Sequence, residues 1–174
     1  SRLPSSCAAK YRADGVEVSD EQVITSASLL QPYLEQRGLS DARVALLGPP
    51  EARSYVRDSK ATLVQPGESR FDALVICDES GYDFVATIDD ILTSILRSID
   101  SGSPPALVLP NPDLIYQRTS ESYGITSGSV AVMLEGILDS RYPDRKFRFE
   151  RLGKPEPRMF QQGVQMCGTE NVLV

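Results

Sequence analysis

Two loops in the second half of the chain place polar side chains where α/β proteins bind their ligands. Pro110-Asn111-Pro112-Asp113 follows the apolar run 106–109, and Gly153-Lys154-Pro155 follows a run with alternating aromatic residues at 147–149. If both runs are parallel strands, both loops lie at the carboxyl ends of strands, where such sheets hold ligands and reactive groups. Taken singly, each loop is also typical of a plain turn with an Asx hydrogen bond or a solvated lysine.

Two other polar groups have structural explanations. Residues 123–129 (YGITSGS) precede an expected helix and could present backbone amides to an anion, but they lack the glycine spacing of phosphate- and dinucleotide-binding loops. The adjacent carboxylates of Asp89 and Asp90 could act as acid, base or metal ligands, yet they fit a capping box that starts at Thr87. We interpret both groups as helix beginnings.

Composition narrows the chemistry further. The chain has no histidine, which excludes Ser-His-Asp triads, Cys-His dyads and His-ligated zinc from within it. A net charge of −6 and the lack of a basic stripe argue against nucleic acid as a partner. No apolar run approaches the ~20 residues that span a bilayer, so no membrane partner is expected. The cysteines are odd in number and widely spaced, which favours a reducing, cytoplasmic location.

Helical patterns alternate with short apolar runs along the chain, and this alternation predicts an α/β fold. A capping box at Ser19 and Gln22 opens a helix expected to reach Arg37, bent or split at Pro32. The other expected helices lie near 7–11, from 51, at 87–101, 127–138 and 159–167, and the expected strands lie at 43–48, 61–64, 71–77, 106–109, around 147–149 and from 171. A polar loop is expected between 110 and 126.

The beginning and the end of the chain favour a segment of a longer protein. The sequence does not open with Met, and it stops within the apolar run Asn171-Val172-Leu173-Val174. A natural domain rarely ends on a buried strand whose edge needs partners. We therefore expect further residues on both sides of this segment.

Four features occur together in one order, which is more specific than any of them alone. They are Asn111-Pro112-Asp113, then Gly128-Ser129 opening a helix that carries Leu134-Glu135, then Leu152-Gly153-Lys154-Pro155-Glu156-Pro157-Arg158-Met159-Phe160, then Asn171–Val174. In this order the chain resembles subfamily IIA of the haloacid-dehalogenase superfamily, which includes pyridoxal phosphatase, 4-nitrophenylphosphatase and N-acetylglucosamine-phosphate phosphatase-like enzymes. Ser1-Arg2 resembles the end of that family's second motif.

The resemblance implies a magnesium-dependent phosphomonoester hydrolase that acts on a small phosphorylated metabolite. In such enzymes an aspartate attacks phosphorus to form an aspartyl-phosphate, and a second aspartate is the general acid and base. These residues would precede Ser1, and the later acidic motif that holds magnesium would follow Val174. The segment alone is therefore expected to be inactive and to contain no metal ligands of its own.

The same resemblance assigns roles to six residues of this chain. Lys154 matches the motif-three lysine that neutralises the nucleophilic aspartate and the phosphoryl oxygens. Asn111, Asp113 and Tyr116 match substrate-facing positions, and Ser1 and Arg2 match positions beside the phosphate.

The implied architecture is a Rossmann-like core interrupted by a large α/β cap. Residues 1–22 and 128–174 are expected to belong to the core and residues 23–127 to the inserted cap, and two copies of the protein are expected to pair through the cap. Two alternatives remain open at this point. The segment could be a non-catalytic module that binds a ligand or a protein, or an unrelated α/β ligand-binding domain with similar loops.

Overall fold

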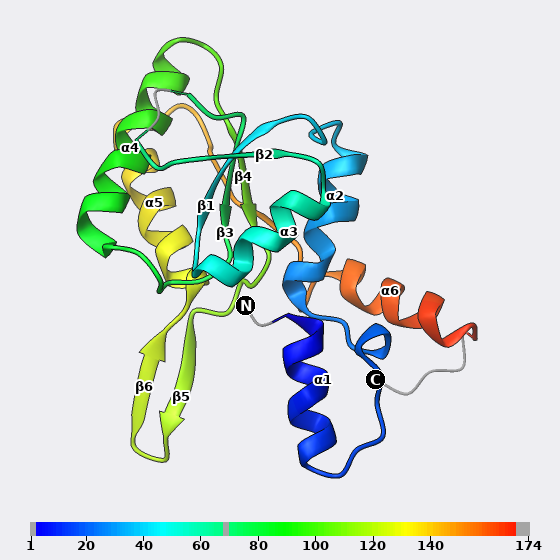
Figure 1. Cartoon of the computed structure of the whole chain (residues 1–174). Coiled ribbons are helices and arrows are strands. Elements are labelled where there is room, and N and C mark those ends of the chain that lie inside the picture. The colour runs from blue at the N-terminus through cyan, green and yellow to red at the C-terminus, as the bar shows by residue number, and fades with distance from the viewer. Residues whose placement is uncertain (1–2, 68–69, 170–174) are drawn as a thin grey trace.

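The computed structural model describes residues 3–67 and 70–169, and these residues form an α/β fold, as predicted. Its centre is a parallel sheet with the strand order β2-β1-β3-β4-β7 (Figure 1). The strands are β1 (Arg43–Leu47), β2 (Thr62–Val64), β3 (Ala73–Ile76), β4 (Ala106–Leu109) and β7 (Glu150–Arg151). Continuous apolar runs such as Ala73–Ile76 suit a parallel sheet, because both of its faces are covered by helices.

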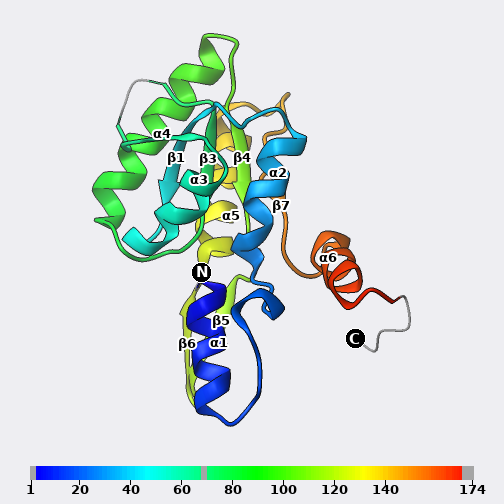
Figure 2. The ribbon, with the colours of Figure 1, turned by 45° about the vertical axis from the view of Figure 1, so that its right-hand side comes forward.

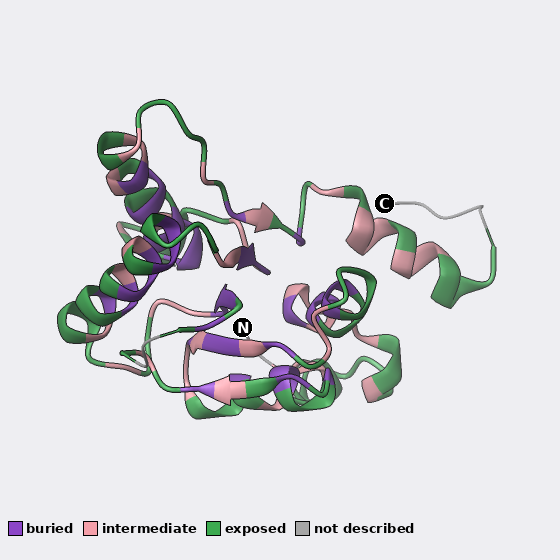
Figure 3. Cartoon of the chain, turned by 90° about the horizontal axis from the view of Figure 1, so that it is seen from above, coloured by how far each residue is buried: buried purple, intermediate pink, exposed green. Residues whose placement is uncertain are grey.

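Helices cover both faces of the sheet. α4 (Phe84–Asp100) and α5 (Ser127–Arg141) lie on one face, and α2 (Leu30–Gln36) and α3 (Arg53–Asp58) lie on the other (Figure 1). Each layer encloses its own cluster of buried side chains, one around Leu74 and Ile91 and the other around Leu34 and Val75. Seen from above, the buried residues gather on the strands and the inner sides of these helices (Figure 3).

Four strands agree with the sequence prediction, and the last one differs. The strands expected at 43–48, 61–64, 71–77 and 106–109 are confirmed, but the strand expected around 147–149 begins only at Glu150. At Phe149 the backbone N–H donates to the carboxylate of Glu135 on α5, at 2.8 Å, and so forms a side-chain bond in place of a strand pair. The strand expected from residue 171 lies outside the described residues.

The helix predicted from 20 to 37 is divided into three pieces, and the division is not at Pro32. The capping box is confirmed, since the Ser19 N–H donates to Gln22 Oε1 at 2.8 Å, but it opens only a 3₁₀ turn, η1 (Asp20–Gln22). A second capping box at Thr25 opens η2 (Ser26–Leu29), and α2 follows. Pro32 lies in the first turn of α2, where no intrahelical hydrogen bond is lost.

α4 begins earlier than predicted. Its N-cap is Asp83, whose carboxylate accepts a hydrogen bond from the Ala86 N–H at 3.1 Å. The capping box predicted at Thr87 is therefore wrong, because Asp83 satisfies the first amides one turn upstream. Asp90 lies within the helix and is exposed.

The loop expected between 110 and 126 contains an unpredicted hairpin. β5 (Ile115–Thr119) and β6 (Ser122–Ile125) pair antiparallel and extend away from the main sheet (Figures 1 and 2). Every residue of β5 is exposed. Polar residues such as Gln117 and Arg118 hid the alternation of the strand from a search for apolar runs.

α1 (Pro4–Ala13) and α6 (Pro157–Cys167) lie outside the layers around the sheet (Figure 2). Ala8 is the buried residue of α1, and α6 contains none among its described side chains. None of the helices in residues 3–67 and 70–169 is both long and apolar enough to cross a bilayer.

The main sheet is continuous across the boundary predicted after residue 127. α5 contacts β3 and β4, and β7 pairs with β4 through Val108↔Glu150 and Leu109↔Arg151. Residues 127–151, most of which were expected in a separate core segment, thus pack on the same sheet as residues 43–109.

Replacing Glu135 by Ala is expected to lower the free energy of unfolding by about 1–3 kcal/mol, because the buried N–H of Phe149 would lose its acceptor. Urea denaturation measures this. Glu135→Gln keeps an acceptor and should cost less, and Glu121→Ala, in an exposed turn, is the matched control. Equal stability of the Glu135→Ala and Glu121→Ala variants would show that the bond contributes nothing.

Cys77 is expected to resist alkylation in the folded protein, whereas Cys167 reacts. Complete burial raises the pKa of the Cys77 thiol to about 12, so little of the reactive thiolate forms near neutral pH. Cys167 is exposed. With iodoacetamide at pH 8, peptide mapping should show that Cys77 reacts at least about a hundredfold more slowly than Cys167. Comparable rates without denaturant would contradict this burial.

Candidate functional site

Two loops meet at the carboxyl ends of β4 and β7. The Leu152 N–H donates to the Leu109 carbonyl at 3.1 Å, and the Gly153 N–H donates to the Pro110 carbonyl at 2.9 Å. These bonds continue the pairing of the two strands into their loops. Residues more than 40 positions apart in the sequence are thereby fixed side by side.

Gly153 is required where the loops touch. A Cβ atom at this position would lie 2.6 Å from the Pro110 carbonyl oxygen and 3.0 Å from the Ser26 Cβ. Contacts under 3 Å force atoms apart, so a larger residue would separate the two loops. The position of the next residue, Lys154, therefore depends on a glycine before it.

The start of α5 fixes the other loop. The Ser127 hydroxyl donates to the Asn111 carbonyl at 3.0 Å, the Gly128 N–H donates to the Asp113 carbonyl at 3.1 Å, and the Thr126 hydroxyl donates to the same oxygen. Inside the loop, the Asp113 N–H donates to Asn111 Oδ1 at 3.3 Å, which is the Asx bond expected of this tripeptide. The stretch before α5 thus supports the loop.

Asn111, Asp113 and Lys154 line one pocket of about 240 Å³ with Ser26 and Met159. Asp113 and Lys154 are exposed, and Asn111 is half-buried. An ammonium and an amide within one small pocket are suited to the oxygens of a phosphoryl group. The carboxylate of Asp113 would accept hydrogen bonds from hydroxyl or amino groups on the rest of a ligand.

Of the other three predicted site residues the structure describes one, Tyr116, and it lies outside this pocket. Tyr116 lies on β5, where its ring packs on Gly124 and beside the Arg118 guanidinium, 5.9 Å from the ring centroid. It is absent from the described lining of the pocket. Ser1 and Arg2 lie outside the described residues, so their predicted roles stay predictions.

Sequence reasoning missed Ser26 and Met159 as pocket residues. Ser26 opens η2, and Met159 lies in the first turns of α6. Ser26 belongs to no motif, and Met159 lies in the 152–160 motif without a role of its own. Only the folding of three distant segments onto one edge of the sheet brings them to the pocket.

The pocket does not by itself fit a magnesium ion. It offers one carboxylate, that of Asp113, next to the positive charge of Lys154, whereas magnesium sites normally use carboxylates with water and phosphate oxygens. In the part of the chain that the structure describes, no cluster of three acidic or cysteine side chains could hold a metal ion.

The fold is shared with solved phosphatase structures. The chain matches a protein described as a possible sugar phosphatase of the haloacid-dehalogenase superfamily, from Cytophaga hutchinsonii, with a TM-score of 0.76 and 23% identity over 99% of this chain and 59% of that chain. It matches 4-nitrophenylphosphatase from Thermotoga maritima with a TM-score of 0.71 and 19% identity, over 95% of this chain and 56% of that one.

A third match is a glycerol phosphate phosphatase from Mycobacterium tuberculosis in complex with magnesium, with a TM-score of 0.74 and 22% identity over 97% of this chain and 46% of that chain. No family model and no curated protein matches the sequence. The chain thus spans 46–59% of the length of these three structures. Over nearly all of its residues it has the fold of these phosphatases, the first of which is described as a member of the haloacid-dehalogenase superfamily.

Proposed function

We propose that this chain is the cap-bearing segment of a magnesium-dependent phosphomonoester hydrolase that acts on a small phosphorylated metabolite. The observation that carries the proposal is the pocket in which Lys154, Asn111 and Asp113 come together. If the loops at 111–113 and 153–155 resembled the family motifs only by chance, there would be no reason for them to lie side by side in the fold. That meeting occurs in a fold whose solved examples include phosphatases, which disfavours an unrelated α/β domain.

Lys154 is the phosphoryl-binding and charge-neutralising residue in this proposal. Its ammonium can donate three hydrogen bonds and carries the charge needed beside a phosphate and a carboxylate nucleophile. The nucleophilic aspartate, which would form the aspartyl-phosphate, its acid-base partner and the magnesium ligands would come from residues beyond this segment. When bound, magnesium would supply charge neutralisation for the phosphoryl group.

Asn111 and Asp113 are proposed to orient the substrate at the entrance to the site. Their loop is held by the Ser127 hydroxyl and the Gly128 N–H at the start of α5, so their positions are fixed before a ligand arrives. Tyr116 is exposed on the projecting hairpin, and a role for it in substrate contact would need that hairpin to close over the pocket. Ser1 and Arg2 keep their proposed place beside the phosphate.

We propose a division of the chain that differs from the one expected from sequence. The cap would run from Ile24 to Leu152, because α5 and β7 pack with its sheet. α1 and α6 would then belong to the core.

α6 supports this division. One side of the helix presents Phe160 and Val164, which form an apolar surface groove with Pro155 and Pro157. No side chain of α6 is fully buried among the described residues, and its contacts there include those with η2 and, through Arg158, with Gln36 and Glu150. The additional length of the matched structures supplies a natural occupant, the remainder of the core. Pairing of two copies through the cap and a cytoplasmic location remain predictions.

The experiment that tests this function is hydrolysis of 4-nitrophenyl phosphate by the protein that contains this segment. Turnover should require magnesium, disappear with EDTA and return when magnesium is added back. Turnover that is unchanged by EDTA, or no turnover of any phosphomonoester in a substrate panel, would contradict the proposal.

A further inference from the structure

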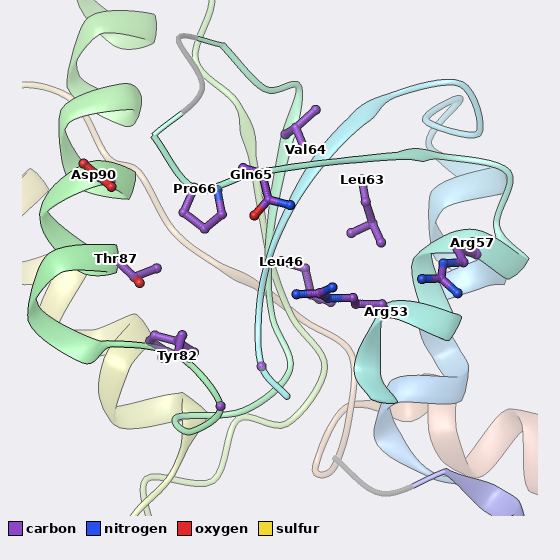
Figure 4. Close-up of a pocket in the computed structure, with 12 residues that line it drawn as sticks. Leu46, Arg53, Arg57, Leu63, Val64, Gln65, Pro66, Tyr82, Thr87 and Asp90 are labelled. Atoms are coloured by element: carbon purple, nitrogen blue, oxygen red, sulfur yellow. The ribbon is translucent and has the colours of Figure 1, made fainter. Parts of the chain in front are cut away.

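A second and larger cavity lies away from Lys154, between α3 and α4 (Figure 4). Its volume is about 600 Å³. None of the residues that line it belongs to the pocket of Asn111 and Lys154. It therefore needs an explanation of its own.

The cavity opens where the sheet has a gap. β2 pairs with β1 only as far as Ala45↔Val64, and the chain then turns away at Gln65 and Pro66. Leu46 of β1 has no pairing partner on β2, and it lines the cavity. Figure 4 shows Leu46, Val64 and Gln65 at this side of the cavity.

The place of the cavity in the topology is one that α/β proteins use for ligands. β2 lies on one side of β1, and β3 lies on the other side. The connection after β1 therefore leads toward one edge of the sheet and the connection after β3 leads toward the other edge, so the point between β1 and β3 is a topological switch point. Ligands bind outside the carboxyl ends of strands at such a switch point. Gly48, which follows β1, and Gly81, which follows β3, both line the cavity.

These two loops are packed tightly against each other. A Cβ atom on Gly81 would lie 2.5 Å from the Pro49 Cα, and Gly81 has a φ of +91°. A Cβ on Gly48 would lie 3.3 Å from the Cys77 Cβ. The floor of the cavity is therefore preformed.

Two arginines of α3 supply the charge. Arg53 and Arg57 are four residues apart, and Figure 4 shows both side chains reaching toward the cavity. Within residues 3–67 and 70–169, no hydrogen bond or ion pair joins either guanidinium to another residue. Like charges at this spacing repel each other, so an anion between them would relieve the repulsion.

The remaining walls are suited to the rest of a small molecule. Leu46, Leu63 and Tyr82 provide apolar surface, and Thr87 provides a hydroxyl. Asp90, on α4, lines the side of the cavity opposite the two arginines (Figure 4). Its carboxylate would repel a phosphate but would accept a hydrogen bond from a hydroxyl or amino group.

We propose that this cavity binds a small molecule through a phosphoryl dianion held by Arg53 and Arg57. Planar guanidinium groups match phosphate oxygens with paired hydrogen bonds, which favours phosphate over a simple halide. The proposal does not depend on the phosphatase activity. The dianion could be free phosphate or a phosphomonoester with an apolar portion.

The test is calorimetric titration with phenylphosphonate, which cannot be hydrolysed, and with inorganic phosphate. The protein carries Lys154→Ala throughout, so that the other pocket does not compete. Arg53→Gln and Arg57→Gln are each expected to weaken binding by about tenfold. Asp90→Asn should strengthen it by about twofold through loss of repulsion. Arg97→Gln, which removes an exposed helix arginine outside the cavity, is the matched control and should have no effect.

Tighter binding of phenylphosphonate than of phosphate would identify a phosphomonoester as the ligand, and equal binding would identify free phosphate. The proposal is overturned if neither probe binds, or if Arg97→Gln weakens binding as much as Arg57→Gln does. Because hydrolysis is not measured, a protein without phosphatase activity could still satisfy this test.

Discussion

Replacing Lys154 by Ala is expected to lower kcat for 4-nitrophenyl phosphate by about 10²- to 10³-fold, the cost of removing one charged group that stabilises a transition state. The lysine is exposed and lines the pocket with Asn111 and Asp113. Its loss should therefore leave the fold intact, with a change in unfolding free energy within about 0.5 kcal/mol. Steady-state kinetics and thermal denaturation on the protein that contains this segment measure the two effects.

Lys146→Ala is the matched control for this variant. Lys146 is also an exposed lysine, but it pairs at 3.4 Å with Asp139 near the C-terminal end of α5, whereas the loop 111–113 contacts the N-terminal end of that helix. Its removal changes the net charge equally and should leave kcat unchanged. If the two lysine variants lost activity equally, or if Lys154→Ala lost none, Lys154 would have no role in phosphoryl transfer.

Gly153→Ala should have the second largest effect, although it adds only a methyl group. That methyl would lie 2.6 Å from the Pro110 carbonyl oxygen, so the loop that carries Lys154 must move away from the loop that carries Asn111. Displacement of a binding group by about 1 Å can cost about 10²-fold in rate. The steric conflict should also lower the unfolding free energy by about 1–3 kcal/mol.

Gly136→Ala makes the same chemical change where there is room for it. Gly136 lies inside α5, and a Cβ there meets no atom within 4 Å. Alanine is the better helix former, so this variant should be more stable by about 0.5–1 kcal/mol and fully active. Normal activity in Gly153→Ala would show that contact between the two loops is not needed for the site.

The parts of the fold that could be predicted from sequence are those in which one local pattern decides the outcome. Ala73–Ile76 is apolar throughout, so its burial on both faces followed directly. Position 83 shows the limit of such patterns. The capping-box pattern predicted a start at Thr87, whereas the helix begins after Asp83, whose carboxylate accepts a hydrogen bond from the Ala86 N–H.

Local patterns do not show which helices pack on which sheet, and the expected domain boundary stays a prediction. The helix at 127–141 follows a loop with family-like features, and it was assigned to the core for that reason. Its actual partners are β3 and β4. The pattern of apolar residues along a helix shows which face is buried, but not which strand or helix it packs against.

The candidate site was predictable in part. The loops at 111–113 and 153–155 were found because polar residues follow apolar runs, and the parallel sheet places both at one edge. Ser26 reaches the same pocket from a segment that was expected to be the middle of a helix. Tyr116 was predicted at the site only because of the family resemblance. It lies on β5 of the hairpin and is not among the described residues that line the pocket.

The most direct test of the phosphoryl site is a crystal structure of the protein that contains this segment, grown with magnesium and tungstate, with the tungsten located by anomalous scattering. The account predicts a tungstate oxygen within about 3 Å of Lys154 Nζ, between the loops 111–113 and 153–154. Tungstate bound at a magnesium site with the Lys154 ammonium turned away into solvent would contradict it.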